Sequence, residues 1–429
     1  MKFSTTIFSS VFPLFHSKTA KDTYIVTSGN IIFSISASLF TILLFRTLTV
    51  SDFGIFSVLL AFILILADLA EFGIGSSLSS FLPRMRSDTT TMGEFLGSAF
   101  LVQVIIGIVI SLLIFLFSSD IADILLHTTE YQYLIQVCSL GIIAAIITNF
   151  SQYALSAQQK FFPNSILTIL AGLLRVIFIL ILIFFKSTSL SFILQMQVIT
   201  LCILASVGCI FLVLNGLRIV MKKSYVQKLL SFSWYLGITK GATSLSGRLD
   251  ILMLVMLSNA TEVGFYSTAL RVASVFSILS GSIITVIAPK FASLSSYVQM
   301  KKYLMKVAVI ITGIIISILI FILVSHPFMT IVFGNKALPS VWVLQLLLIS
   351  IIFSIATIPL TTLTTYYFQK PHAVTIINIV QLFIIFTANI LFIPLYGRIG
   401  TAYSLILAYG CTFLLSSYTT YVYLGKKFK

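Results

Sequence analysis

Charged residues are scarce in this sequence, where they make up only 9% of the 429 residues and only 11 of them are acidic. Soluble domains contain roughly 25% charged and about 45–50% apolar residues. Here 59% of the residues are hydrophobic. Because so few charges cannot cover a water-soluble surface, we expect lipid to be the solvent for most of the chain.

The sequence also lacks the residue patterns of common catalytic sites. Its four cysteines and four histidines show no disulfide framework and no metal-ligand spacing, and we find no glycine-rich phosphate loop and no Ser–His–Asp set. The segment 118–133 is acidic but has no basic residue that could hold a pyrophosphate, as a polymerase or glycosyltransferase would need. We therefore predict neither an enzyme nor a metal or other cofactor.

Long hydrophobic runs dominate the sequence. Crossing a hydrocarbon core of about 30 Å takes about 20 helical residues. The runs lack the alternation of barrel strands, so helices are the expected way to satisfy their backbone. The chain is thus predicted to be an all-α polytopic membrane protein of about 12 transmembrane helices, at 24–47, 53–73, 95–117, 134–155, 164–185, 192–214, 233–257, 263–286, 306–324, 341–363, 374–393 and 400–421.

The net charge of +15 follows membrane topology. Most Lys and Arg residues fall in the segments on one side of the predicted spans, and the opposite side holds only Arg46, Lys186, Lys336 and Arg398. This is the positive-inside distribution, which places both termini in the cytoplasm. The basic residues therefore predict a multi-pass protein of an inner (cytoplasmic) membrane, with membrane lipids and no nucleic acid as partners.

A motif recurs after about half the chain length. Residues 52–57 (DFGIFS) return as 262–267 (EVGFYS), and Gln159-Lys160 returns as Gln369-Lys370, both displaced by 210 residues. Two matches with one offset indicate an internal repeat. Six helices per repeat give two bundles related by a pseudo-two-fold axis along the membrane normal, with a cavity between them.

This organisation gives five predicted segments. They are a cytoplasmic lead-in (1–23), a six-helix bundle (24–214), a basic amphipathic linker (215–232), a second six-helix bundle (233–421) and a basic tail (422–429).

Several motifs together resemble a known family. They are 248–253 (RLDILM), 263–271 (VGFYSTALR), Ala288-Pro289, 53–56 (FGIF) and 68–74 (DLAEFGI). In this order they are similar to the polysaccharide-transport family, the O-antigen and other lipid-linked oligosaccharide flippases of the multidrug/oligosaccharidyl-lipid/polysaccharide (MOP) superfamily.

The resemblance implies a flippase with alternating access in a bacterial inner membrane. Its cargo would be undecaprenyl-pyrophosphate-linked oligosaccharide for O-antigen, lipopolysaccharide, capsule or another surface polysaccharide, and a polymerase and a chain-length regulator would be its partners. Peptidoglycan-precursor flippases of the superfamily usually have two more helices, which this sequence lacks.

Four basic residues fall inside the predicted spans: Arg175, Lys240, Arg248 and Arg271. A lone cation at the bilayer centre costs about 2.5–3.5 kcal/mol on insertion scales, so we expect these residues to face a central cationic cavity. Side chains near span ends could instead extend to the headgroups.

Two helices carry polar stripes at helical spacing. Helix 233–257 has Gly237, Lys240, Gly241, Ser244 and Arg248, and helix 24–47 has Asn30, Ser34, Ser38 and Thr41. Arg and Lys bind phosphate oxygens, and small polar side chains bind sugar hydroxyls. The predicted substrate-binding residues are Arg175, Lys240, Arg248, Arg271, Asn30, Ser34 and Ser244. The glycines on the first stripe could equally allow close helix packing.

Asp68 and Glu71 share one face near the cytoplasmic end of helix 53–73. They are candidates for coupling to H+ or Na+, but the favoured interpretation is that they neutralise Arg84 or Arg86. Asp250 lies opposite the basic stripe and is expected to form an ion pair with a neighbouring helix. An ion-coupled multidrug exporter of the same superfamily remains the alternative, although its cationic cargo would favour an acidic cavity. A polysaccharide polymerase is a less favoured second alternative.

Overall fold

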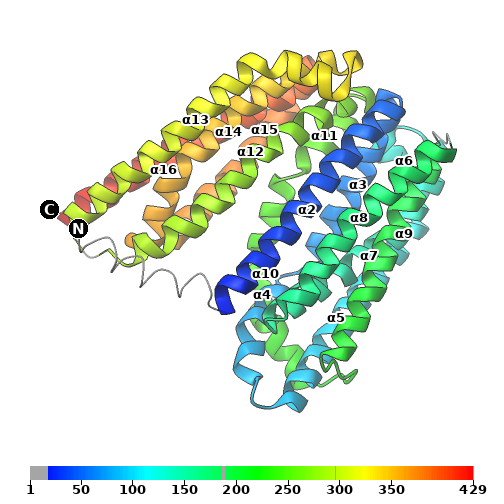
Figure 1. Ribbon diagram of the computed structural model, residues 1–429, viewed down its shortest axis with the longest axis horizontal. Helices are drawn as coiled ribbons and strands as arrows, with labels where there is room; N and C mark the ends of the chain where they lie inside the picture. Colours follow the sequence, from blue (N-terminus) through cyan, green and yellow to red (C-terminus); the bar gives the residue numbers. More distant parts are fainter. Residues whose placement is uncertain (1–17, 186–188, 295, 429) are drawn as a thin grey trace, which may run out of the picture. The chain divides into compact units, whose positions relative to one another are not determined.

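The computed structural model describes residues 18–428 except 186–188 and 295, and every regular element in that part of the chain is helical (Figure 1). The first half contains α2 (Lys18–Thr47), α3 (Val50–Glu71), α4 (Ile74–Phe81), η1 (Leu82–Met85), α5 (Thr89–Leu116), α6 (Ser118–Leu126), η2 (Thr129–Tyr131), α7 (Gln132–Ala157), α8 (Phe161–Phe185) and α9 (Leu190–Leu214). The second half contains α10 (Lys223–Ser246), α11 (Leu249–Leu257), α12 (Ala260–Ala292), α13 (Tyr297–Phe333), η3 (Asn335–Ser340), α14 (Val341–Thr362), η4 (Leu363–Tyr367), α15 (Pro371–Tyr396) and α16 (Arg398–Phe428).

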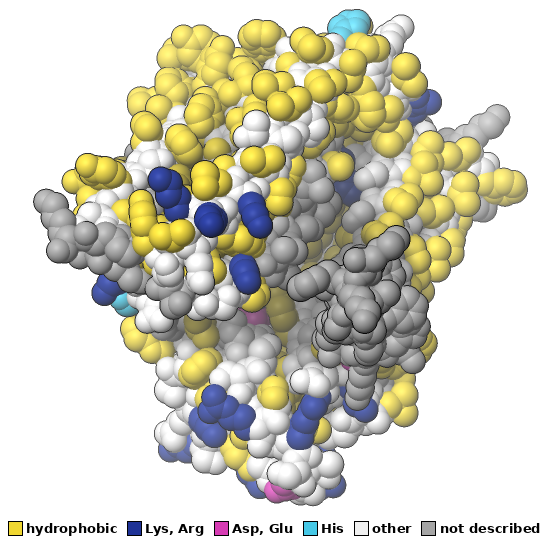
Figure 2. Space-filling model, turned by 60° about the vertical axis from the view of Figure 1, so that its left-hand side comes forward, with side chains coloured by type: hydrophobic (Ala, Val, Ile, Leu, Met, Phe, Trp, Pro, Cys, Tyr) yellow, Lys and Arg dark blue, Asp and Glu magenta, His cyan; other side chains and the backbone are white. Residues whose placement is uncertain are grey.

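Ten helices in the described residues are long and apolar enough to cross a membrane. They correspond to ten of the twelve predicted spans, and the other two predictions, 233–257 and 263–286, fall on α10, α11 and α12. Large hydrophobic side chains on these helices are exposed, such as Leu323 at 81% and Val309 at 73% on α13. In Figure 2, hydrophobic side chains gather over the upper part of the face, whereas Lys and Arg form groups elsewhere on it and Asp and Glu are few. The exposed hydrophobic side chains suit contact with lipid.

The prediction of one continuous helix over 233–257 is wrong. α10 ends at Ser246 and α11 begins at Leu249, and between them Arg248 has φ −145° and ψ −4°, which is not helical. A glycine at position 247 weakens the helix there, because glycine loses more backbone entropy than other residues on entering a helix. The stripe that starts at Gly237 therefore continues along a helix only as far as Ser244.

The ends of the predicted segments also differ from the structure. Residues 1–17 of the predicted lead-in lie outside the described residues, and residues 18–23 are the start of α2. Residues 223–232 of the predicted linker are the first turns of α10, and residues 422–428 of the predicted tail continue α16.

The chain forms two compact units that are not consecutive stretches of sequence. Among the described residues, unit 1 consists of 18–43, 63–122 and 129–241, and unit 2 consists of 44–62, 123–128 and 242–428. In unit 1, α7 packs between α5 and α9, and a buried cluster around Phe95, Phe150 and Leu212 joins these helices (Figure 1). In unit 2, α16 packs against both α14 and α15, and α12 packs against α14.

The two copies of the repeated motif have the same local structure in unit 2. Each begins a helix, α3 or α12, and the residue before that helix caps it. Thr49 Oγ1 accepts the backbone N–H of Asp52 at 3.1 Å, and Asn259 Oδ1 accepts that of Glu262 at 3.0 Å. Side-chain caps satisfy helix N–H groups that have no partner within the helix.

The glycines of the two motifs lie where α3 and α12 approach each other. A β-carbon added to Gly54 would lie 1.8 Å from the carbonyl oxygen of Ala260, the first residue of α12. One added to Gly264 would lie 2.1 Å from the carbonyl oxygen of Val50, the first residue of α3. The contact is thus two-fold-like, since each glycine meets the start of the other helix.

The second repeated pair shows the same agreement. Gln159 follows α7 with φ 58°, and Gln369 follows η4 with φ 55°, both in the left-handed region that few non-glycine residues adopt. Each is followed by a lysine and then by a new helix, α8 or α15. The internal repeat therefore extends to backbone conformation.

Replacing Gly264 by alanine should destabilise the protein, because the new methyl group would overlap the carbonyl of Val50. Overpacking of this kind costs about 1–3 kcal/mol. We expect Gly264→Ala and Gly54→Ala each to lower the unfolding temperature of the detergent-purified protein. Gly313→Ala is the matched control, because nothing lies within 4 Å of its added β-carbon. Equal unfolding temperatures for all three variants would contradict the proposed contact.

Candidate functional site

Glu71, the last residue of α3, forms an ion pair with Lys240 of α10 in unit 1, in which the carboxylate is buried and the lysine is half-buried. Lys240 Nζ lies 2.5 Å from Glu71 Oε2, donates a hydrogen bond of 2.9 Å to the Tyr153 hydroxyl of α7, and lies 4.1 Å from the centre of that ring. The carboxylate also accepts the backbone N–H groups of Gly73 and Gly75, at 3.2 and 2.5 Å. Two elements far apart in sequence thus compensate each other's charge at a site where Glu71 is only 3% exposed.

Close backbone contact between α10 and the turn after α3 positions this pair. Phe72 and Gly73 both have positive φ, 45° and 76°, so the chain turns sharply from α3 into α4. A β-carbon added to Gly73 would lie 2.6 Å from the Ser233 carbonyl oxygen, and one on Gly237 would lie 2.8 Å from that of Phe72. Gly237 therefore serves helix packing, and its spacing on α10 brings Lys240 to Glu71.

The expected neutralisation of Arg84 or Arg86 by Glu71 is wrong, because the cation at Glu71 is Lys240. Arg86 instead donates to the backbone carbonyl of Gln158 at 2.9 Å. Asp68, one turn before Glu71, is 3.5 Å from the amide nitrogen of Asn149 on α7. Sequence patterns reveal partners that are close along the chain, as Arg84 and Arg86 are to Glu71. They do not reveal an ion pair between residues as far apart in sequence as Glu71 and Lys240.

The other predicted residues of unit 1 lie on α2 and α8. Arg175 of α8 is half-buried, with its guanidinium carbon 5.0 Å from the centre of the Phe33 ring of α2, a cation–π distance. Asn30 is exposed and Ser34 is half-buried on the same helix. α2 thus presents one aromatic and two polar side chains, of which Phe33 contacts the arginine.

The predicted residues of unit 2 lie around the break between α10 and α11. The Arg248 guanidinium reaches back to the Ser244 hydroxyl at 3.4 Å, so the structure brings these two residues together across the break. Arg271 of α12 is half-buried, and its Nε is buried without a hydrogen-bond partner among the described residues. Such a donor can bind an acceptor that enters from outside the chain.

Asp250 is hydrogen-bonded to a tyrosine, whereas an ion pair was expected. It is buried on α11 and accepts a hydrogen bond from the hydroxyl of Tyr266 on α12, and also the backbone N–H of Ile251 at 2.9 Å. Neither Tyr153 nor Tyr266 has a signal in the sequence for these contacts, because a tyrosine in an apolar helix looks like an ordinary packing residue. In the described residues no group of three or more His, Cys, Asp or Glu could hold a metal ion.

A double-mutant cycle on Glu71 and Lys240 should give a large coupling energy. Removing one partner of a buried pair leaves the other charge uncompensated and costs about 3–5 kcal/mol. We expect Lys240→Met and Glu71→Gln each to lower the unfolding temperature, and the double variant to recover much of the loss.

The matched control is the pair Lys222–Glu94. Its atoms are also 2.5 Å apart, but the lysine side chain is 44% exposed. Surface pairs contribute about 0–1 kcal/mol, so Lys222→Met and Glu94→Gln should have small, additive effects. Additive effects at Glu71 and Lys240 as well would show that these two residues do not interact in solution.

Similarity to known proteins identifies the family and the fold of this chain. A family described as polysaccharide biosynthesis proteins matches residues 19–295, and no curated protein matches the chain. Among solved structures, an inward closed lipid II flippase MurJ has a TM-score of 0.75 at 14% identity, over 92% of this chain and 87% of its own. An inward-facing multidrug resistance transporter of the MATE family has a TM-score of 0.68 at 13% identity, over 95% and 99%.

A MOP superfamily transporter from Pyrococcus furiosus, described by the reverse polarity of its binding pocket, has a TM-score of 0.55 at 13% identity, over 94% of each chain. At such low identity these likenesses show that the chain has the MOP fold. Because the matched segment covers more than half of the sequence, the chain belongs to the polysaccharide biosynthesis protein family.

Proposed function

We propose that this protein is a flippase that moves undecaprenyl-pyrophosphate-linked oligosaccharide repeat units from the inner to the outer leaflet of a bacterial inner membrane by alternating access. The observation that carries the proposal is the set of basic residues in the predicted spans of a chain of this family: Arg175, Lys240, Arg248 and Arg271. They exceed the acidic residues there, which are Asp68, Glu71 and Asp250. A pyrophosphate headgroup is the kind of cargo that such a charge balance favours.

The buried donor of Arg271 supports an anionic cargo. A buried N–H group that lacks a hydrogen bond costs about 1–3 kcal/mol, more when it belongs to a charged group. A phosphate oxygen would satisfy it, and guanidinium groups bind phosphate through more than one N–H. A cationic drug would be repelled at this position.

The relatives named above agree with a lipid-linked cargo without identifying it. The structure with the TM-score of 0.75 is by name a flippase of lipid II, and the family is described by polysaccharide biosynthesis. The MATE transporters keep a multidrug exporter as the second candidate. Both candidates are transporters, so neither calls for a catalytic residue in this chain.

Glu71 and Lys240 give the proposal a coupling step. While the carboxylate holds Lys240 at 2.5 Å, the ammonium is occupied. A proton or a sodium ion on Glu71 would weaken the pair, and Lys240 could then bind a phosphate oxygen of the cargo. Asp68, one turn away on α3, would lie near the same ion.

A deletion strain tests the direction of transport. Lipid-linked oligosaccharides are extracted, and their leaflet is determined by accessibility to an impermeant sugar-modifying reagent. We expect complete repeat units to remain on the cytoplasmic leaflet and surface polymer to be lost. Arg271→Gln should reproduce the defect at normal membrane levels, whereas Lys301→Gln, an exposed residue of α13, should complement fully.

Two other outcomes would overturn the proposal. Repeat units that reach the periplasmic leaflet but remain unpolymerised would indicate a polymerase. Unchanged surface glycan together with new sensitivity to cationic drugs would indicate an exporter.

The coupling step is tested with purified protein in proteoliposomes. We expect an imposed proton or sodium gradient to accelerate the appearance of lipid-linked oligosaccharide in the opposite leaflet, because the ion releases Lys240 from Glu71. Glu71→Gln, which carries no charge to neutralise, should transport at a rate that does not depend on the gradient. An unchanged gradient response in Glu71→Gln would exclude this pair as the coupling site.

A further inference from the structure

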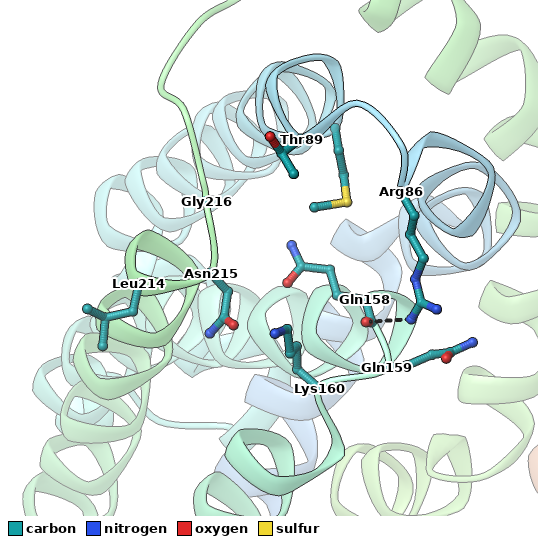
Figure 3. Close-up of a pocket in the computed structure, with 9 residues that line it drawn as sticks. Arg86, Thr89, Gln158, Gln159, Lys160, Leu214, Asn215 and Gly216 are labelled. Carbon is teal, nitrogen blue, oxygen red and sulfur yellow. Dashed lines mark hydrogen bonds between the residues drawn. The ribbon is translucent and has the colours of Figure 1, made fainter. Parts of the chain in front are cut away.

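Unit 1 contains a polar cavity of about 640 Å³ at the ends of several helices. It lies where α7 turns into α8, where α9 ends and where α5 begins, and by the charge distribution this end of the unit faces the cytoplasm (Figure 3). Its lining is Arg86, Thr89, Met92, Gln158, Gln159, Lys160, Leu214, Asn215 and Gly216. Two of these residues are basic and none is acidic.

Gln158 is the residue of this cavity whose buried side chain has no hydrogen-bond partner, within the part of the chain that the structure describes, to explain its burial. Its side chain is only 6% exposed and points into the cavity, yet neither its amide nitrogen nor its amide oxygen has a hydrogen-bond partner among the described residues. Leaving a buried polar group without a partner destabilises the folded protein. The amide is therefore available to bind a polar group that occupies the cavity.

The second half of the chain shows that the turn itself does not require a glutamine. By the 210-residue offset Gln158 corresponds to Phe368, which precedes Gln369 as Gln158 precedes Gln159. The two turns share the positive φ of the following glutamine. Phe368 is buried and packs its ring 5.2 Å from that of Tyr367 and 5.9 Å from that of Tyr423. An apolar residue thus suits this backbone, and Gln158 is the exception.

The charges around Gln158 define the chemistry of the ligand. Arg86 is fixed at the edge of the cavity by its hydrogen bond to the Gln158 carbonyl, and the Lys160 side chain points toward the same space (Figure 3). The nearest acidic residue in sequence, Asp88, is occupied as the cap of α5, where it accepts the N–H groups of Thr90 and Thr91 at 3.0 Å. The hydrogen bond from the Thr91 hydroxyl lowers the pKa of Asp88.

We propose that this cavity binds a phosphate group whose attached glycerol or sugar hydroxyls hydrogen-bond to Gln158 and Asn215. Lys160 and Arg86 would compensate the phosphate charge, and the amides would bind the hydroxyls. The phosphate comes either from the headgroup of a membrane lipid or from a soluble phosphate compound. This site is separate from the charged residues within the spans, and it is tested by binding alone, so its failure leaves the proposed transport function untouched.

The test measures binding of dioleoyl phosphatidylglycerol to the purified full-length protein by native mass spectrometry, with dioleoyl phosphatidylcholine for comparison and inorganic pyrophosphate as competitor. A hydrogen bond to a charged group contributes about 1.5–3 kcal/mol, so we expect Lys160→Gln to weaken binding about tenfold or more. Gln158→Met should weaken it about threefold to tenfold. Lys301→Gln, which removes an exposed charge elsewhere, should not change it.

The two sources of phosphate give different results. Binding of phosphatidylglycerol that pyrophosphate does not displace identifies a lipid headgroup site. Displacement by pyrophosphate, or binding of pyrophosphate alone with the same dependence on Lys160, identifies a site for soluble phosphate compounds. If neither probe binds with an affinity that depends on Lys160 and Gln158, the proposal is wrong.

The unfolding temperature of ligand-free Gln158→Met distinguishes a binding residue from a structural one. Replacing an unsatisfied buried amide with a thioether of similar shape should leave the temperature unchanged or raise it. A decrease of several degrees would mean that Gln158 stabilises the fold, and would overturn its role in binding.

Discussion

The close crossing of α3 and α12 at Gly54 and Gly264 is the backbone contact that brings the two copies of the repeated motif together in unit 2. In lipid, helices do not associate by the hydrophobic effect, and small residues allow the backbone contact that replaces it. Lipid also offers no water to helix ends, so the side chains of Thr49 and Asn259 satisfy the N–H groups beside the crossing. The repeated sequence motif therefore reflects a physical requirement. Each of the two helix starts needs a side-chain cap, and each needs a glycine that lets the other helix approach closely.

The same kind of contact creates the charged site in unit 1. Gly73 and Gly237 let α10 approach the turn after α3, and this approach brings Lys240 to Glu71. A buried ion pair is weak evidence for stability, since apolar replacements of similar volume often serve as well. The fold alone therefore does not account for the pair. The proposed transport cycle gives the pair a role, since its charges would separate when an ion binds to Glu71.

The sequence predicted those features that depend on local pattern or on a shared offset. Hydropathy located ten spans. The offset of 210 residues predicted an internal repeat, and the structure shows that the repeat extends to helix caps, close-packed glycines and left-handed turns. It did not predict the break at Arg248, because apolar residues continue on both sides of Gly247 and hydropathy has no measure of backbone conformation. It also assigned Glu71 to nearby arginines, because the glycines that bring Lys240 close act through tertiary packing. The sequence also did not indicate a role for Gln158, because the burial of its amide and the lack of a hydrogen-bond partner arise only in the folded chain.

The repeat also gives a way to separate what the fold requires from what a ligand requires. Where both halves keep the same residue, as at Gly54 and Gly264 or at Gln159 and Gln369, the backbone explains the choice. Where the backbone is the same and the side chain differs, the backbone cannot explain it. Phe368 fills its place with aromatic contacts, whereas Gln158 leaves a buried amide facing a basic cavity. Because both turns are equally able to form, the difference between the two halves must come from what each turn contacts. In the second half this is the protein itself, and in the first half we infer that it is a phosphate-bearing ligand.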